Sequence, residues 1–298
     1  MPSNDFKNFN ENSSFLIVGT VRNCEKYLNK SISQLTHILG KVKDLHWFLV
    51  ESDSEDDTLN SLSKLKETNN NFNYITLGRL RDKFRKRTDR LAYCRNLYKE
   101  HLDNNLVYSN IDYVIVSDFD GVNDKLTANA FNSCWDNKKW DVCTANQDGP
   151  YYDIWALRHK YWSPNDCWAQ YNFLNKYNSN TKKNLFTSVY SRMIKIPPDS
   201  PWIEVDSAFG GIAIYKKEIF KHGIYKGLDE NGDEICEHVY FHQMLKKIGA
   251  QIYINPKFIN AAYTNHTKKS IVINDFFFMI FSKLSTYFTK KINQSIKK

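Results

Sequence analysis

Two aspartates separated by one phenylalanine, Asp118 and Asp120, are the residues of this sequence best suited to chemistry. They follow the largely apolar run 111–117, which is typical of a strand buried on both faces, and Gly121 after them signals a turn. Side chains alternate along an extended chain, so we expect both carboxylates to point the same way and Phe119 to turn into the core. Adjacent carboxylates repel each other unless a cation holds them, and hard divalent ions prefer oxygen ligands. The pair therefore indicates a metal site; the alternative is two solvated loop acids that cap the next helix.

The elements that must position this pair are predicted from the pattern of apolar residues. Apolar runs typical of strands occur at 15–20, 47–50, 74–77, 140–145, 212–215 and 251–256. Helix-like segments alternate with them, which predicts an α/β fold with a mainly parallel central sheet. Ligands of such sheets bind beyond the carboxyl ends of the strands, where segments 18–23, 51–57 and 118–120 fall. We therefore interpret these three segments as one site.

Composition narrows the class of ligand. The chain has 298 residues, a formal net charge of +8 and 15% aromatic residues. The charge indicates phosphate-bearing ligands or an anionic surface and does not by itself argue for nucleic acid, while Trp and Tyr offer platforms for a sugar or a base. The 6 cysteines include no Cys-x-x-Cys pair. This argues against a zinc cluster and indicates buried free thiols in a reducing compartment.

The two ends of the chain differ from its middle. Residues 1–13 are polar and lack the apolar core of a signal peptide, and no run is long enough to span a bilayer. These features predict a soluble, cytoplasmic protein. Residues 271–288 are rich in Phe and are followed by lysines, so this segment could lie peripherally on a membrane, pack on the domain or mediate self-association.

Basic residues and paired glycines add candidates to the site. Arg90, Arg95 and Asn96 lie in a predicted helix after the basic block 79–87, close enough to the sheet to reach a diphosphate. A solvated basic face is the alternative. The pair Gly210–Gly211 precedes a predicted strand and would either let a ligand approach the backbone closely or form a bulge.

Four segments of the chain resemble GT-A-type glycosyltransferases, and the CAP59-like capsular mannosyltransferases in particular. These segments are 87–92 with Arg95-Asn96, 116–120, 152–158 and 206–215. The resemblance covers roughly residues 14–267. It implies a single Rossmann-like GT-A domain there, between the polar N-terminus 1–13 and a C-terminal aromatic and basic helix and tail at 268–298.

The resemblance implies a metal-dependent transferase that moves a sugar from a UDP- or GDP-sugar to a hydroxyl of a carbohydrate or glycoconjugate, as in polysaccharide biosynthesis. It implies Mn²⁺ or Mg²⁺ on Asp118, Asp120 and His266, with Asp120 also counted as catalytic. Glu237, at a predicted helix start, resembles the base of inverting members. The alternative is a first-turn acid favoured by the helix dipole, and Glu234 is the fallback base.

The remaining implied contacts divide between donor and acceptor. The implied donor-binding residues are Thr20, Arg22, Asn23, Glu51, Ser52, Asp53, Arg90, Arg95, Asn96, Ser117 and Asp118. The implied acceptor-binding residues are Asp153, Trp155, Arg158, Gly210 and Gly211. No nucleic-acid partner is implied.

Two other functions fit parts of the same pattern. The segment 114–122 also matches the start of a haloacid-dehalogenase-type phosphatase, in which Asp118 would be a nucleophile and Asp120 a general acid. That family needs a later Gly-Asp motif after a buried strand, and 231–234 is a poor match. An inactive carbohydrate-binding descendant of a transferase is the third possibility.

Overall fold

The computed structural model describes residues 12–264 and residue 267. Its strands are β1 (Ser14–Val21), β2 (Asp44–Glu51), β3 (Phe72–Thr76), β4 (Tyr113–Ser117), β5 (Val142–Gln147), β6 (Ile203–Val205), β7 (Ile212–Lys216) and β8 (Ile252–Ala261). Its α-helices are α2 (Glu25–Ile38), α3 (Thr58–Thr68), α4 (Arg87–Asn104), α5 (Ala128–Asn132), α6 (Cys167–Tyr177), α7 (Thr181–Ser188), α8 (Lys217–Phe220) and α9 (Glu237–Lys247). Short 3-10 turns are η2 (Leu80–Asp82), η3 (Leu106–Tyr108), η4 (Ser133–Trp135) and η5 (Tyr190–Arg192). The predicted metal ligand His266, the predicted tail 268–298 and residues 1–11 lie outside the described residues.

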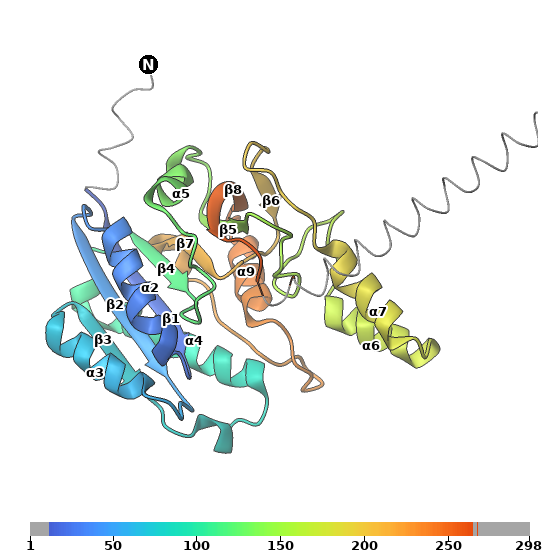
Figure 1. Ribbon diagram of the computed structural model, residues 1–298, viewed down its shortest axis with the longest axis horizontal. Helices are drawn as coiled ribbons and strands as arrows, with labels where there is room; N and C mark the ends of the chain where they lie inside the picture. The colour runs from blue at the N-terminus through green and yellow to red at the C-terminus, as the bar shows by residue number, and fades with distance from the viewer. Residues whose placement is uncertain (1–11, 265–266, 268–298) are drawn as a thin grey trace, which may run out of the picture.

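The described strands form one 8-stranded mixed sheet in the order β3-β2-β1-β4-β7-β5-β8-β6 (Figure 1). The strands from β3 to β4 run parallel because a helix crosses from each strand to the next. β7 inserts antiparallel between β4 and β5, and β6 is antiparallel to β8, whereas β5 and β8 pair in parallel. The predicted α/β class with a mainly parallel central sheet in one domain is confirmed.

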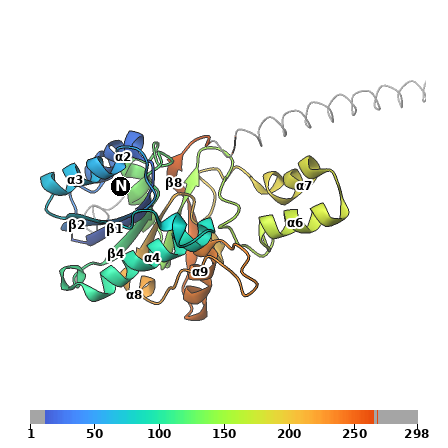
Figure 2. The ribbon, with the colours of Figure 1, turned by 90° about the horizontal axis from the view of Figure 1, so that it is seen from below.

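Helices cover both faces of the sheet because its strands are apolar on both sides (Figure 2). In β1, Leu16 and Val18 share one hydrophobic core with α4 and α9. Phe15 and Ile17, the intervening residues, share the other core with α2, α3 and α5. This alternation is the two-residue period of a strand, and a strand with two apolar faces can only lie inside such a three-layer arrangement.

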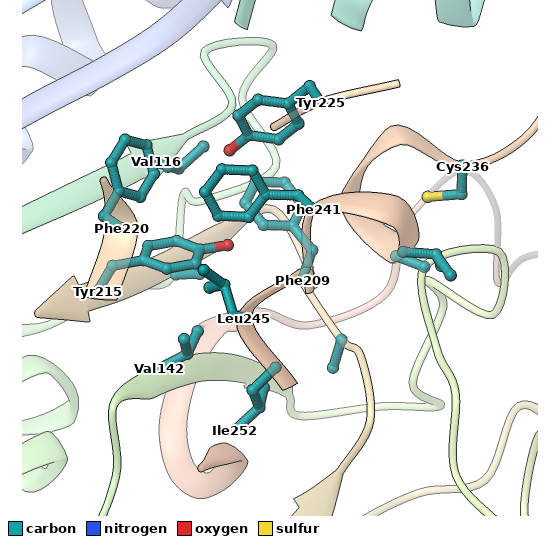
Figure 3. Packing of buried hydrophobic residues seen from close by; sticks show 14 of the residues in the cluster. Val116, Val142, Phe209, Tyr215, Phe220, Tyr225, Cys236, Phe241, Leu245 and Ile252 are labelled. Atoms are coloured by element: carbon teal, nitrogen blue, oxygen red, sulfur yellow. The ribbon is translucent and has the colours of Figure 1, made fainter. Parts of the chain in front are cut away.

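An aromatic cluster fixes α9 to the sheet (Figure 3). Tyr215 of β7, Phe220 of α8, Tyr225 and Phe241 of α9 are buried together. Tyr225 stacks on Phe241 with ring centroids 4.2 Å apart, and Tyr215 meets Phe241 edge to face at 5.8 Å. Such pairs stabilise a packing arrangement beyond their area of burial. The cluster therefore sets where the first turn of α9, with Glu237, lies relative to β7.

The polar ends of several strands meet at one edge of the sheet. Ser117 at the end of β4 pairs with Ile212 at the start of β7, because these strands are antiparallel. The backbone N–H of Asp118 consequently donates to the Gly211 carbonyl at 2.9 Å. On the other side, β1 and β2 end together, with Val21 opposite Glu51. The segments predicted to form one site thus end along the same edge.

The cysteines and the helices also bear on the sequence predictions. Each of the six cysteines is free and buried, as predicted. Burial raises the pKa of the Cys94 thiol to about 11, so this thiol stays protonated at neutral pH.

Among residues 12–264, no helix has the length and apolar character needed to cross a membrane.

Candidate active site

The Asp118-Phe119-Asp120 segment leaves β4 as the alternation of side chains predicts. Phe119 is buried, and its ring packs on Gly19 of β1, where a Cβ atom would lie 2.5 Å from the ring. The Asp118 side chain is 34% exposed and Asp120 is exposed. Gly121 then takes a φ of +90°, a conformation that favours glycine. The missing side chain at position 19 and the turn at 121 therefore leave both carboxylates on the solvent side of the strand end.

Two buried asparagines hold the backbone around this segment. Asn123 Nδ2 donates to the carbonyl oxygens of Asp118 at 2.9 Å and of Gly211 at 3.1 Å. Asn260 Nδ2 donates to Asn123 Oδ1 at 2.6 Å and to the Gly210 carbonyl at 2.7 Å. Sequence reasoning missed both residues. No signal in the sequence marked Asn260, because the predicted strand ended at residue 256 whereas β8 extends to Ala261.

Arg95 joins the strand end to the two helices beside it. The residue is 4% exposed, and its Nε donates to Glu237 Oε1 at 3.1 Å. Its Nη2 lies 3.8 Å from Asp118 Oδ1, and its Nη1 donates to the Tyr98 hydroxyl at 3.3 Å. The sequence placed Arg95 at the border of a helix face, within reach of a diphosphate. It is instead buried among its partners because α9 packs over α4.

The site holds more negative than positive charge. Burial raises the pKa of the Asp118 carboxyl to about 7, against the opposing effect of Arg95. The charges of Asp120, Asp153 and Glu237 contribute to the same rise. Arg95 is therefore one buried cation facing several acids, and a further cation at Asp118 and Asp120 would relieve their repulsion.

This surplus of carboxylates fits a hard divalent ion. The donor set is two side-chain carboxylates at a strand end, one half-exposed and one exposed, which leaves coordination positions open for a ligand. The described residues bring no group of three or more His, Cys, Asp or Glu together in a geometry that could hold a metal by itself. His266, the predicted third ligand, is outside them. The chemistry of the two aspartates is thus suited to a metal shared with a phosphate-bearing ligand.

The two candidate bases lie in different surroundings. Glu237 is buried in the first turn of α9 and pairs with Arg95. Glu234 Oε1 accepts the backbone N–H of Thr88 at 3.0 Å and its hydroxyl at 3.1 Å. These hydrogen bonds lower the pKa of the Glu234 carboxyl, which caps the first turn of α4. The fallback role predicted for Glu234 stays a prediction, and the structure gives its carboxylate a second role at the N-terminus of a helix.

The acids at the end of β2 are buried and bonded within the protein. Glu51 accepts hydrogen bonds from the Ser54 backbone at 3.0 Å and from the Thr76 hydroxyl. Asp53 has a φ of +62°, and its Oδ1 accepts the backbone N–H of Arg81 at 2.9 Å. These acids were predicted to bind the donor. The structure shows them shaping the backbone at that place.

The other predicted donor-binding residues differ in their exposure and in their hydrogen bonds. Thr20 is half-buried and Arg22 is exposed beside it, while Asn23 has a φ of +49° and accepts the Glu55 N–H at 2.7 Å. Arg90 donates to two backbone carbonyls of the preceding loop, at 2.7 and 2.8 Å.

Both polar atoms of the Asn96 side-chain amide form hydrogen bonds with the backbone of Tyr225. The side chain donates to the Tyr225 carbonyl and accepts from the Tyr225 N–H, each at 2.9 Å. These two hydrogen bonds give Asn96 a role in the fold, and its predicted donor contact stays a prediction. The Ser117 side chain is buried as well, with its hydroxyl accepting from Asn123 Nδ2 at 3.2 Å.

The predicted acceptor residues separate into two groups. Asp153 lies at the site, where its Oδ2 accepts the Gly210 N–H at 3.0 Å. Trp155 and Arg158 instead donate to the same Asp166 oxygen, at 2.9 and 2.7 Å. Arg158, taken from the sequence as a positive charge for the acceptor, is therefore already paired, and it anchors the start of α6.

A buried histidine was missed by the sequence analysis. His238 follows Glu237 in α9 and stacks on Phe209, with ring centroids 3.9 Å apart. Burial lowers the pKa of His238 well below its usual value, and the charge of Arg95 acts in the same direction, so the ring is neutral. Neither ring nitrogen has a hydrogen-bond partner among the described residues. No periodicity or motif marks this residue in the sequence.

Solved structures to which this chain is similar include a mannosyltransferase and a synthase. The mannosyltransferase PcManGT from Pyrobaculum calidifontis, in complex with GDP-Man and Mn²⁺, has a TM-score of 0.45 and 12% identity, over 84% of this chain and 56% of that one. S. aureus TarS 1-349 in complex with UDP-GlcNAc has a TM-score of 0.44 and 13% identity, over 85% of this chain and 59% of that one. Glucosyl-3-phosphoglycerate synthase from Mycobacterium tuberculosis, in complex with UDP, has a TM-score of 0.40 and 9% identity, over 87% and 72%.

This likeness concerns the fold alone. The chain spans less than three fifths of the first two structures' own length. No protein-family model matches the chain, and no curated protein is similar to it in sequence. The resemblance to CAP59-like mannosyltransferases therefore stays a prediction, and any chemistry must be argued from the residues of this chain.

Proposed function

We propose that this chain is a metal-dependent glycosyltransferase of the GT-A type, which uses a nucleoside-diphosphate sugar as donor and a hydroxyl of a carbohydrate or glycoconjugate as acceptor. The observation that carries the proposal is the Asp118–Asp120 pair at the carboxyl end of β4, in a site whose acids outnumber its buried cation. Ligands of parallel sheets bind at such strand ends. A divalent ion is commonly bound by one or two protein carboxylates together with phosphate oxygens of a ligand. A pyrophosphate therefore fits this carboxylate pair.

Asp118 and Asp120 would hold Mn²⁺ or Mg²⁺, and the ion would neutralise the diphosphate as the bond to the sugar breaks. Arg95 acts on the site through its contacts to Asp118 and Glu237, as a positioning residue. Glu237 would take the proton of the acceptor hydroxyl if the reaction inverts configuration. If it retains configuration, Glu237 would bind that hydroxyl instead. Gly210 and Gly211, with φ of +74° and +94°, present backbone beside the aspartates.

The phosphatase alternative lacks the second acid motif that it requires. In segment 231–234, the backbone N–H of Asp233 donates to Asp229 Oδ1 at 2.8 Å, as in a surface turn. The Glu234 carboxylate caps α4. No strand directly precedes this segment, because β7 ends at Lys216 and the short helix α8 follows it. Segment 231–234 thus does not support the phosphatase interpretation of Asp118.

The decisive experiment compares nucleotide-sugar turnover with phosphatase turnover. We expect Mn²⁺-dependent release of UDP or GDP from one of the UDP- or GDP-sugars, and none of that activity in Asp120→Asn. Asp124→Asn is the matched control, because Asp124 is an exposed acid four residues away. The control should keep full activity and the Mn²⁺-induced rise in melting temperature, which Asp120→Asn should lose. Turnover of p-nitrophenyl phosphate by the wild type, or undiminished sugar turnover in Asp120→Asn, would overturn the proposal.

A further inference from the structure

The helices α6 and α7 form a hairpin at one end of the molecule. Both views show them side by side, at the end far from β2 and β3 (Figure 1 and Figure 2). Asn184 is buried between the helices, where it donates to Asn175 Oδ1 at 2.8 Å and accepts from Asn178 Nδ2 at 3.1 Å. At the base, Asp166 accepts from the first backbone N–H groups of α6. The hairpin is thus held together by its own hydrogen bonds, and most residues of its tip, 173–183, are exposed in the described part of the chain.

Two aromatic side chains are exposed at this tip. Phe173 is 59% exposed and Tyr177 is 78% exposed. They lie one helical turn apart, with ring centroids at 5.1 Å, so they form one apolar surface. Burial of such rings is favourable, and the fold leaves them outside its cores. An apolar partner surface would therefore find a preformed contact here.

Three lysines lie in the same segment as these rings, without acids in that segment to balance them. Lys176, Lys182 and Lys183 are exposed, and none forms an ion pair with another residue in the described ranges. The sequence has no Asp or Glu at all from 167 to 198. Lys182 and Lys183 also lie in the first turn of α7, where the helix dipole disfavours positive charge. These two lysines are therefore placed against the stability of α7, which is typical of a surface selected for binding.

We propose that the hairpin tip, residues 173–183, docks on an anionic lipid surface. Aromatic rings partition to the level of the lipid headgroups, and lysine side chains reach out to their phosphates. The tip carries both kinds of side chain on a helical hairpin that its own hydrogen bonds stabilise. A second copy of the chain fits less well, because two acid-free tips would repel each other. The inference is independent of the transfer chemistry at Asp118 and of residues 271–288.

The test reads the environment of the tip itself in the full chain. Ser179→Cys places a thiol at the exposed connection between α6 and α7, and the native cysteines are buried. With an environment-sensitive fluorophore on Cys at 179, we expect a blue shift on adding vesicles of phosphatidylcholine with phosphatidylglycerol, and none with phosphatidylcholine alone. The matched control is Lys138→Cys, an exposed site outside the hairpin, which should show no shift.

Charge and apolar variants test which groups carry the binding. Co-sedimentation with the anionic vesicles should weaken about fivefold for each lysine removed in Lys176→Gln, Lys182→Gln and Lys183→Gln, and high salt should have the same effect. The control changes Lys41, Lys138 and Lys139 to Gln and keeps wild-type binding. Phe173→Ala with Tyr177→Ala should also weaken binding, whereas Leu106→Ala with Val107→Ala, also exposed apolar residues, should not.

Three outcomes would overturn the proposal. The first is a label at 179 that anionic vesicles leave unshifted, even if the chain pellets through another segment. The second is a blue shift that grows with protein concentration in the absence of vesicles, which would indicate a second copy. The third is equal loss of binding in the tip variants and their matched controls, which would indicate net charge alone.

Discussion

Arg95 shows how burial changes what a side chain can do. From the sequence it is one of several arginines near a predicted phosphate site, but it is 4% exposed and contacts acids from two other elements. A guanidinium suits this place because it presents donors in several directions at once and stays charged when buried. Removal of one member of such a group leaves the others as uncompensated buried charges. The positions of Asp118 and Glu237 therefore depend on Arg95.

A double-mutant cycle measures this dependence. We expect Arg95→Met and Glu237→Gln to be coupled by about 1–3 kcal/mol in the free energy of unfolding, measured by urea denaturation. The matched pair is Lys99 and Asp103 on the same helix, with Nζ and Oδ2 2.6 Å apart but more exposed. Its coupling should be about 0.3–0.5 kcal/mol. A value for Arg95 and Glu237 no larger than that of the control pair would contradict the role assigned to Arg95.

Helix α4 depends on a segment far away in the sequence. Its first turn is capped by Glu234, and the Thr88 hydroxyl donates to the Gly227 carbonyl at 2.6 Å. A Cβ at position 227 would lie 2.1 Å from the Thr88 carbonyl oxygen, so only glycine fits. The segment 227–234 therefore fastens α4, which carries Arg95, to the start of α9, which carries Glu237. The two helices are positioned together.

Substitution of Glu234 and of Glu237 should have different effects on stability and turnover. Glu234→Gln should cost about 0.5–1 kcal/mol of stability, because the cap loses its charge at the helix N-terminus, but should keep nucleotide-sugar turnover. Glu237→Gln should lose turnover, since its carboxylate is the one proposed to meet the acceptor. Transfer assays together with thermal unfolding would check both variants. The reverse pattern, with Glu234→Gln inactive and Glu237→Gln active, would restore Glu234 as the base.

At the scale of the whole molecule, two hydrophobic cores on either side of one sheet stabilise the fold. Polar groups buried in these cores make the stability depend on pH. His242 lies inside the core on the α4 and α9 face, where Nδ1 meets the Ser207 hydroxyl at 2.8 Å and Nε2 meets the Tyr215 hydroxyl at 2.9 Å. Burial lowers the pKa of His242 from 6.5 to about 3. Folding therefore requires the neutral ring.

Acid should consequently weaken the fold through this buried histidine. Between pH 6.5 and about 3 the unfolded chain binds a proton at this position that the folded chain does not. The free energy of unfolding should therefore fall as pH falls, by up to about 1.4 kcal/mol per pH unit for this one group. Urea denaturation across that range should show a shallower slope for His242→Gln, while His222→Gln at the exposed surface should match the wild type. An unchanged slope in His242→Gln would contradict the assignment.

The sequence by itself determined the α/β class and the strand ends at which the candidate site is proposed. Apolar periodicity gives the strands of β1, β2 and β4, and the Asp118-Phe119-Asp120 alternation gives the direction of each side chain, since both are properties of consecutive residues. Only the tertiary structure decided that Arg95 is buried against Glu237, that Glu234 caps α4, and that Asn260 holds the backbone beside Gly210. These contacts join residues far apart in the chain, and no local pattern records them. They form because packing across the sheet leaves buried polar groups that must find partners wherever the fold supplies them.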